Sequence, residues 1–364
     1  MSIDIRQFVD INIQYKETYN VSSTRPVTVL FTNEGTDNYK KLISSLSEFT
    51  DGSTMPNTLK YVKSYFGFGG NKLYIIGKVT DSTIQTVLST LPNEYIALTY
   101  CKVDSSNIVE NYTAMKTICK AYNGLSTTYG VNQKIFIANS SSVLTSAHDS
   151  DKIQNLAVKA TNTFGDEMSI AAYLSNIDFY GTNTVHDYCF TSEDAATAVD
   201  LTTAKYSDLI EFNYNVDVAL AGHTRNCGGN LKDGTDLVNQ FSLIVLQQTL
   251  TDRVLTILTE KLKGESGLNA IYTTMSQELS KYVTNGYLST DKTWTKPTLT
   301  VTKNSITYTI IEKDTQLLLG YKISILPLSS LTEDEKIARK TPYIYVVLAD
   351  SYGIRKIAIN GEVI

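Results

Sequence analysis

Tryptophan, histidine and cysteine are scarce in this chain of 364 residues, which has one Trp, three His and four Cys. The cysteines, at positions 101, 119, 189 and 227, include no CxxC pair. The sequence therefore predicts no disulfide framework and fits a reducing cytoplasm. No apolar run reaches membrane-spanning length, and the first segment, MSIDIRQFVD, lacks the basic start and apolar core of a secretory signal. We expect a soluble protein without membrane insertion.

An excess of basic charge is also missing. The formal net charge is -5 at pH 7 and the isoelectric point is near 5.4. A general nucleic-acid-binding protein would usually show a basic face, so we expect no direct contact with nucleic acid. Hydrophobic residues make up 42% and charged residues 19% of the chain. These proportions are typical of a globular protein, here with enough residues for two or three domains.

Catalytic motifs are missing as well, since the sequence has no GxSxG, HExxH or P-loop. The FGFGG turn at residues 66–70 follows a helical pattern and precedes a strand. A phosphate-binding loop must instead follow a strand and open a helix. The neighbours His148-Asp149 and His186-Asp187 are not acid–base dyads by adjacency, because adjacent side chains point apart. We predict a protein that is not an enzyme and needs no cofactor.

One metal hypothesis stays open as an alternative. His186 and Cys189 are three positions apart, and His223 and Cys227 are four apart. Both spacings suit a tetrahedral zinc site. The simpler interpretation is a polar loop containing a histidine and a small buried cysteine. If zinc were bound, the chain would be a cytoplasmic α/β enzyme or ligand-binding protein.

The N-terminal residues 2–16 alternate between apolar and polar side chains, with Gln7 and Phe8 as exceptions. The apolar positions on one side are Ile3, Ile5, Val9, Ile11, Ile13 and Tyr15. A period of two predicts a strand with one buried face, which at about 3.3 Å per residue would extend roughly 50 Å. Such a strand can be the first strand of the chain's own sheet or an arm that reaches a neighbouring molecule. The pattern alone favours neither.

From residue 26 to residue 210 strand and helix patterns alternate. The sequence predicts strands at 26–31, 73–76, 95–100, 134–138 and 168–174. It predicts helices at 39–49, 56–67, 83–91, 107–122, 151–164 and 193–210. Alternation of this kind indicates an α/β layer fold with a partly parallel sheet.

The remainder has a different pattern. A loop-like region at 219–234 is followed by two amphipathic helices, at 236–262 and 268–282, with Asp236 as the N-cap of the first. After Trp294 the chain becomes β-rich. A hairpin is predicted over 298–311 and strands at 321–326, 343–349 and 354–364, with a capping box formed by Thr332 and Glu335.

Together these elements predict an α/β protein (α+β overall) with extended β-strand arms at both termini. We divide it into an N-terminal β arm over 1–20, an α/β core over 21–210, a loop plus helical pair over 211–290, a β-rich part over 291–341 and C-terminal strands or arm over 342–364.

Several short motifs, in order along the chain, resemble contractile phage tail sheath proteins and a shorter sheath-like family among them. They are VDINIQYKETYNVSSTRPVTVLF at 9–31, the helix, Gly-Gly turn and strand at 56–79, NGYL at 285–288, IARKTPY at 337–343 and IAINGEV at 357–363. Large peripheral insertions of the long sheaths are missing, so the chain resembles a near-minimal sheath.

The resemblance implies a structural virion subunit that forms hexameric rings stacked helically around a bacteriophage tail tube. Contraction would drive the tube through the host envelope for genome ejection. The implied partners are other copies of the chain, the tail tube protein, and baseplate and tail terminator proteins, with assembly in the host cytoplasm. Arms at both chain ends would pair with a sheet in neighbouring subunits. The arm residues would be Ile3, Ile5, Val9, Ile11, Ile13, Tyr343, Tyr345, Val347, Ile357, Ile359 and Val363.

Overall fold

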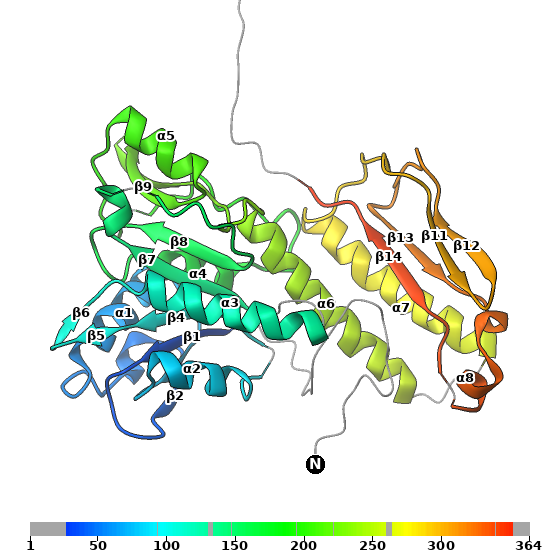
Figure 1. The fold of residues 1–364 in the computed structure, drawn as a ribbon, viewed down its shortest axis with the longest axis horizontal. Coiled ribbons are helices and arrows are strands. Elements are labelled where there is room, and N and C mark those ends of the chain that lie inside the picture. Colours follow the sequence, from blue (N-terminus) through cyan, green and yellow to red (C-terminus); the bar gives the residue numbers. More distant parts are fainter. Residues whose placement is uncertain are drawn as a thin grey trace, which may run out of the picture.

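The computed structural model describes residues 27–92, 94–129, 134–146, 148–193, 195–220, 222–259, 264–338 and 340–351. Figure 1 shows two lobes: an α/β lobe, residues 27–227, and a smaller β lobe, residues 288–351. The long helix α6 (Leu237–Thr259) runs from the first lobe toward the second, and α7 (Gly264–Thr284) returns antiparallel beside it (Figure 1).

An eight-stranded sheet forms the centre of the α/β lobe, in the order β10-β9-β8-β7-β4-β1-β3-β2. Its strands are β1 (Val27–Thr32), β2 (Lys40–Ile43), β3 (Leu73–Ile76), β4 (Tyr95–Cys101), β7 (Ile135–Ser140), β8 (Leu156–Ala160), β9 (Asn215–Leu220) and β10 (His223–Cys227). Pairing is parallel from β3 through β9, and only the edge strands β2 and β10 are antiparallel. The mostly parallel sheet confirms the predicted α/β class.

Helices cover both faces of this sheet, which explains why its inner strands β1, β3, β4, β7 and β8 are mostly apolar. One face packs against α1 (Pro56–Gly67), α4 (Met168–Asn176) and α6. The other face packs against α2 (Asp81–Leu88), α3 (Tyr112–Tyr129) and α5 (Thr203–Glu211). The small hairpin of β5 (Val103–Asp104) and β6 (Asn107–Ile108) precedes α3.

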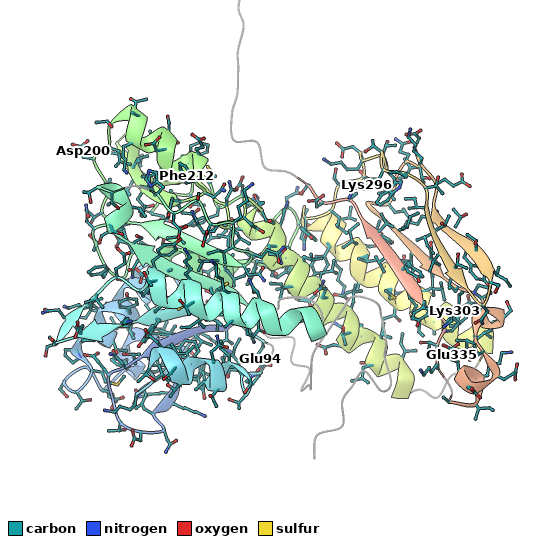
Figure 2. The ribbon with its side chains drawn as sticks, viewed as in Figure 1. Glu94, Asp200, Phe212, Lys296, Lys303 and Glu335 are labelled. Carbon is teal, nitrogen blue, oxygen red and sulfur yellow. The ribbon has the colours of Figure 1, made fainter. Side chains whose placement is uncertain are left out.

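The β lobe contains two antiparallel strand pairs. One is β11 (Leu299–Lys303) with β12 (Ile306–Ile311), and the other is β13 (Tyr321–Ile325) with β14 (Ile344–Leu348). The short helix α8 (Glu333–Ile337) lies between β13 and β14 in the chain. Figure 2 shows Lys303 and Glu335 together at one end of this lobe, where the hairpin tip contacts α8 through their 2.8 Å ion pair.

Several predicted local structures are confirmed. Helix α1 ends in a Gly-Gly turn that leads into β3: Gly69 has a φ of +81°, and a Cβ on Gly70 would lie 2.4 Å from the Tyr65 ring. Asp236 caps α6 by accepting from the backbone N of Asn239 at 2.8 Å. The capping box of Thr332 and Glu335 opens α8. The β11–β12 turn sits on Asn304 and Ser305, both with positive φ, as a type I′ turn requires.

The predicted helix at 39–49 is wrong. Residues Lys40–Ile43 form the edge strand β2, and a short 3-10 helix, Leu46–Glu48, follows. Leu42 and Leu46, assigned to the apolar face of that helix, are exposed, while Ile43 is buried. A segment this short does not distinguish the helical period of about 3.6 residues from the strand period of two. Hydrogen bonding with β3 makes it a strand.

The predicted helix at 151–164 and strand at 168–174 are also wrong, because the structure has β8 in the first segment and α4 in the second. All five residues of β8 are buried, so the strand shows no alternation. Helix α4 is buried nearly all round and has no polar stripe. Burial on every side removes the periodicity on which both predictions depended.

The boundaries at 107–122 and 193–210 needed correction as well. Helix α3 starts at Tyr112, and α5 starts only at Thr203, where Thr202 caps it by accepting from the backbone N of Lys205. The region at 219–234, predicted as a loop, contains the end of β9 and all of β10. Strand β10 (HTRNC) is polar because it is an edge strand.

Candidate functional site

The carboxyl edge of a parallel sheet is where open α/β folds bind ligands, next to the point where the strand order reverses. Here the reversal lies between β1 and β4. Glu34, just beyond β1, occupies the N-terminus of α1. Its carboxylate accepts from the Thr58 backbone N at 2.7 Å, the Thr58 hydroxyl at 2.8 Å and Asn57 Nδ2 at 3.0 Å. The helix N-terminus that would hold a ligand anion already holds an internal carboxylate.

Glu110 has the same role farther along this edge. It precedes α3 and accepts from the backbone N atoms of Ser141 and Ser142, just beyond β7, at 2.9 and 3.0 Å. The Ser140 hydroxyl adds a bond of 3.0 Å. At both places an internal carboxylate binds the donors that a ligand anion would otherwise use.

The alternative zinc ligands are not brought together. His223 and Cys227 are the first and last residues of β10, so the strand itself separates them by roughly 13 Å at about 3.3 Å per residue. His186 and Cys189 are not part of β10 and lie in the loop that follows α4. Over the described parts of the chain, no three His, Cys, Asp or Glu side chains are grouped as a metal ion would require.

The adjacent pair His148-Asp149 has separate partners, as adjacency predicts. His148 Nε2 lies 3.2 Å from Lys205 Nζ. Burial and the Lys205 charge lower the pKa of His148. Asp149 instead accepts from the Tyr112 hydroxyl at 2.8 Å and pairs with Lys116. The two side chains do not form a proton-transfer dyad.

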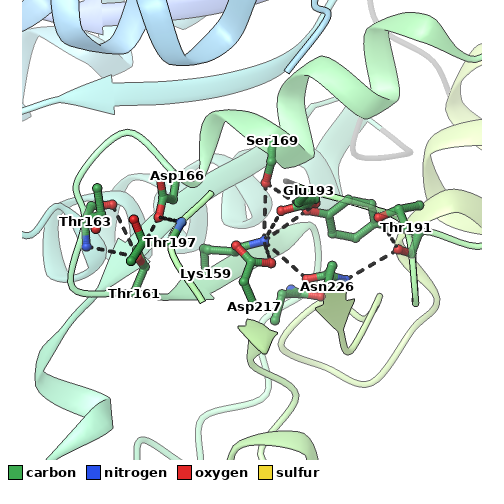
Figure 3. Close-up of polar contacts among 12 residues, drawn as sticks. Lys159, Thr161, Thr163, Asp166, Ser169, Thr191, Glu193, Thr197, Asp217 and Asn226 are labelled. Atoms are coloured by element: carbon green, nitrogen blue, oxygen red, sulfur yellow. Dashed lines mark hydrogen bonds and ion pairs between the residues drawn. The ribbon is translucent and has the colours of Figure 1, made fainter. Parts of the chain in front are cut away.

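A buried ionic cluster surrounds Lys159, as Figure 3 shows, and it was not predicted from the sequence. Lys159 is on β8, and its Nζ lies 2.5 Å from Asp217 Oδ1 on β9 and 2.7 Å from Glu193 Oε2 in the loop before α5. The side chains of Lys159, Asp217 and Glu193 are 0%, 2% and 5% exposed. Tyr188, Ser169 and Asn226 complete the shell around the amine, at 3.2, 3.3 and 3.3 Å. A lone lysine in the apolar run LAVKA is the one signal that pointed here.

The β13–β14 pair is a sheet of only two strands with both faces covered. One face packs against the core that includes α6 and α7, through Tyr321, Ile323, Ile325, Ile344, Val346 and Leu348. The other face joins Leu326 and Val347 to the β11–β12 hairpin. Covered faces explain why two strands are ordered here, since an isolated two-stranded sheet is marginal.

The two edges of this sheet have no further strand among the described residues. Leu326 N donates to Tyr343 O at 3.0 Å, and Ala349 N donates to Gly320 O at 2.9 Å. Bonded and non-bonded pairs alternate in antiparallel sheets. With the register Ile323↔Val346, the backbone groups of Ile323 and Val346 therefore face outward. Both side chains are also only partly buried.

The structure places three of the predicted arm residues. Tyr345 and Val347 are in β14 and Tyr343 precedes it, and β14 pairs with β13 of the same chain. The others, Ile3, Ile5, Val9, Ile11, Ile13, Ile357, Ile359 and Val363, lie outside the described residues. Their role in linking subunits stays a prediction.

The last described residue, Ser351, is fixed beside the end of α7. Its N donates to Tyr287 O at 2.8 Å, and Asn239 Nδ2 of α6 donates to its carbonyl at 2.9 Å. A polar pocket of about 280 Å³ lies at this point, lined in part by Ser351, His186 and Asp236. The chain therefore leaves the β lobe from an anchored position on the helical pair.

Comparisons with solved structures decide the fold. A chain of the anti-feeding prophage helical sheath in its contracted state matches with a TM-score of 0.64 at 13% identity, over 97% of this chain and 99% of that chain. The chain has a tail sheath fold. A chain of the anti-feeding prophage baseplate also gives a TM-score of 0.64, at 15% identity and the same coverage. The sheath tail protein from Desulfitobacterium hafniense gives 0.52 at 6% identity, over 78% of this chain and 91% of that one.

The sheath fold accounts for nearly the full length of the chain, including both lobes, and confirms the predicted resemblance at the level of fold. No protein-family profile and no curated protein matches the sequence. Within the described residues, no helix combines the length and apolar character needed to cross a bilayer.

Proposed function

We propose that this chain is a structural subunit of a contractile tail sheath. Subunits would polymerise as stacked hexameric rings around a tail tube and contract to drive the tube through a host envelope. The observation that carries the proposal is the β13–β14 sheet, whose faces are covered and whose two edges have no further strand among the described residues. An exposed sheet edge is an aggregation liability in a monomer, but in an obligate assembly it is a connector.

Two segments whose sequences predict extended strands are suited to these two edges. The alternating N-terminal stretch contains Ile3, Ile5, Val9, Ile11 and Ile13, and the C-terminal stretch contains Ile357, Ile359 and Val363. We infer that each adds as a strand to the β13–β14 sheet of a neighbouring subunit. Each backbone hydrogen bond gained would contribute about 1 kcal/mol net. Such links would persist while the α/β lobes rotate and form larger contacts during contraction.

The proposed partners are other copies of the chain, a tail tube protein, and baseplate and tail terminator proteins, in the tail of a virion or a virion-like particle assembled in the host cytoplasm. The occupied carboxyl edge supports a role without catalysis, because Glu34 and Glu110 satisfy the groups that a substrate anion would use.

Negative-stain electron microscopy of the concentrated full-length protein, with light scattering on the same sample, tests this proposal. We expect hollow tubes or stacked rings for the full chain. Deleting residues 1–15 should abolish the polymers and leave a folded body, monitored by circular dichroism.

Two results would contradict the proposal. A truncated chain that still forms tubes would show that the N-terminal segment is not a connector. A truncated chain that unfolds would show that this segment is an internal strand. A monodisperse small species from the full chain calls for the same experiment with tube protein added, and failure to coat the tube would overturn the sheath function.

A further inference from the structure

We propose that the side chains of Lys159 and Asp217 become joined by an amide bond, an intramolecular isopeptide cross-link, with Glu193 carrying the protons. The inference rests on the buried cluster of Figure 3 and is independent of the proposed assembly. It assigns a covalent modification to a group of residues that has no role in binding another chain.

The three side chains of the cluster are held in direct contact. The amine of Lys159 lies 2.5 Å from Asp217 Oδ1 and 2.7 Å from Glu193 Oε2, and the three side chains are at most 5% exposed. Strands β8 and β9 are adjacent and parallel, with Lys159 opposite Asn215. The backbone thus fixes nucleophile and electrophile in contact, and such a fixed geometry corresponds to a very high effective concentration.

The charges in the cluster do not balance. One ammonium group faces two carboxylates in a site without solvent, so the fully ionised cluster carries an excess negative charge. Burial raises the pKa of Asp217 to about 7, although Lys159 opposes the shift. The upward shift favours the protonated acid relative to an ordinary aspartate, and a carboxylic acid is the form that an amine can attack.

The amine must also lose a proton. Burial lowers the pKa of Lys159 and the two carboxylates raise it, with a net rise, so the neutral amine is a minor form. Moving one proton from Lys159 to Glu193 removes two buried charges at once, which burial favours. The attraction of the ion pair opposes the transfer, because Lys159 lowers the pKa of Glu193. Because little of the amine is neutral, the reaction is slow. Because the site is buried, the released water does not return readily to hydrolyse the amide, and the reaction is effectively irreversible.

The step balances without any further reactant. The reacting state has Lys159 as an ammonium, Asp217 as a carboxylic acid and Glu193 as a carboxylate. Glu193 first accepts one proton from the ammonium, and the neutral Nζ bonds to Asp217 Cγ. Glu193 then gives its proton to the hydroxyl at Asp217 Oδ2, whose bond to Cγ breaks as water leaves. Glu193 takes up the second proton that the nitrogen loses, so it ends as a carboxylic acid. Asp217 Oδ2 is buried and has no hydrogen-bond partner while both carboxyl groups are ionised. The Tyr188 hydroxyl donates to Glu193 Oε1 and holds that carboxyl group in place.

The product would connect β8 to β9 across 58 positions of the chain. It would also fix the loop that carries Glu193, which reaches β10 through a 2.8 Å bond from its backbone N to Thr224 O. Such a link stops these strands from separating when the α/β lobe is under load.

The test is the intact mass of the full-length protein under denaturing conditions, followed by peptide mapping. We expect the wild type to be lighter than its sequence mass by one water, and one tryptic species to join the peptides of Lys159 and Asp217. Lys159→Arg and Glu193→Gln should restore the full sequence mass. The matched control is Lys116→Arg, since Lys116 also faces two carboxylates, Asp149 and Asp151, but in a solvent-accessible site. This variant should keep the water loss.

A wild type at full sequence mass after prolonged incubation at neutral pH overturns the proposal. A link from Lys159 to Glu193 overturns the assignment of Asp217, and undiminished water loss in Glu193→Gln overturns the role of Glu193. If Lys159→Arg fails to fold, the peptide map of the wild type alone decides.

Discussion

At the scale of single residues, internal carboxylates satisfy backbone groups that would otherwise be open. Glu34 is the clearest case, since it accepts from backbone and side-chain donors of Asn57 and Thr58 in the first turn of α1. A carboxylate at a helix N-terminus is favourable both as a cap and toward the helix dipole. The same arrangement closes the crevice in which an α/β enzyme would bind its ligand.

Glu34→Ala is expected to lower the free energy of unfolding by about 2–3 kcal/mol, because it removes a cap and leaves donors without partners. Urea unfolding followed by circular dichroism measures the change. Glu333→Ala is the control: Glu333 is also in the first turn of a helix, but its side chain is 82% exposed and pairs with Lys336. It should cost less than about 0.5 kcal/mol. Equal losses in the two variants would refute the capping role.

A second residue-scale prediction concerns Asp252 on α6. Burial raises the pKa of Asp252 to about 7, and its Oδ1 has no hydrogen-bond partner among the described residues. The folded state therefore holds this proton more tightly than the unfolded state. Its stabilising contribution is complete below the ordinary Asp pKa and is lost as pH rises through the window up to about 7.

Asp252→Asn should remove this pH dependence. Above neutral pH we expect the variant to be more stable than the wild type by about 1 kcal/mol, a figure reduced for the partial exposure of the side chain. At pH 4 the difference should largely vanish. Urea unfolding at several pH values gives the comparison, and a difference that does not change with pH would contradict the assignment.

At the scale of elements, the β13–β14 sheet has no further strand at either edge among the described residues, and the proposed assembly depends on these edges. Ile323 has its backbone groups directed outward from β13. Replacing its N–H by proline removes a donor that has no backbone partner among the described residues, and proline is tolerated on edge strands.

Ile323→Pro is expected to leave the subunit folded and to weaken or abolish polymer formation. Ile323→Ala is the matched control, because it shortens the same side chain but keeps the N–H, and it should still form polymers. Sedimentation and negative-stain images of the two variants give the result. Polymers formed equally well by both would mean that the β13 edge accepts no strand.

At the scale of the whole molecule, the two lobes share one hydrophobic core. The larger core cluster contains residues of β1, β4 and α4 from the α/β lobe, of α6 and α7, and of β13 and β14 from the β lobe. Tyr321 of β13 is also tied to α7 by a 2.7 Å contact between its hydroxyl and that of Ser276. The helical pair therefore connects the β lobe to the α/β lobe through one continuous core.

A shared core predicts that the subunit unfolds as one unit. Under conditions that keep it monomeric, such as the chain without residues 1–15, differential scanning calorimetry should show one transition with calorimetric and van't Hoff enthalpies in agreement. Two resolved transitions would show instead that the lobes are independent domains joined by α6 and α7.

The sequence by itself determined the elements whose faces differ. Helices α1, α6 and α7, the strands of the β lobe and the caps at Asp236 and Thr332 all carry local signals, because one side of each contacts solvent or a turn. These elements sufficed for the α/β class, and the short motifs sufficed for the resemblance to tail sheath proteins.

Tertiary structure decided what local signals cannot contain. Segments β8 and α4 are buried on all sides, so their sequences show no helical or strand period. Pairing with β7 and β9 makes the first a strand, and packing against the face of the sheet accommodates the second as a helix. The Lys159 cluster joins residues 34 and 58 positions apart, and the open edges of β13 and β14 exist only because the described chain adds no third strand. Contacts between distant residues depend on how the layers pack, and packing is a property of the folded chain.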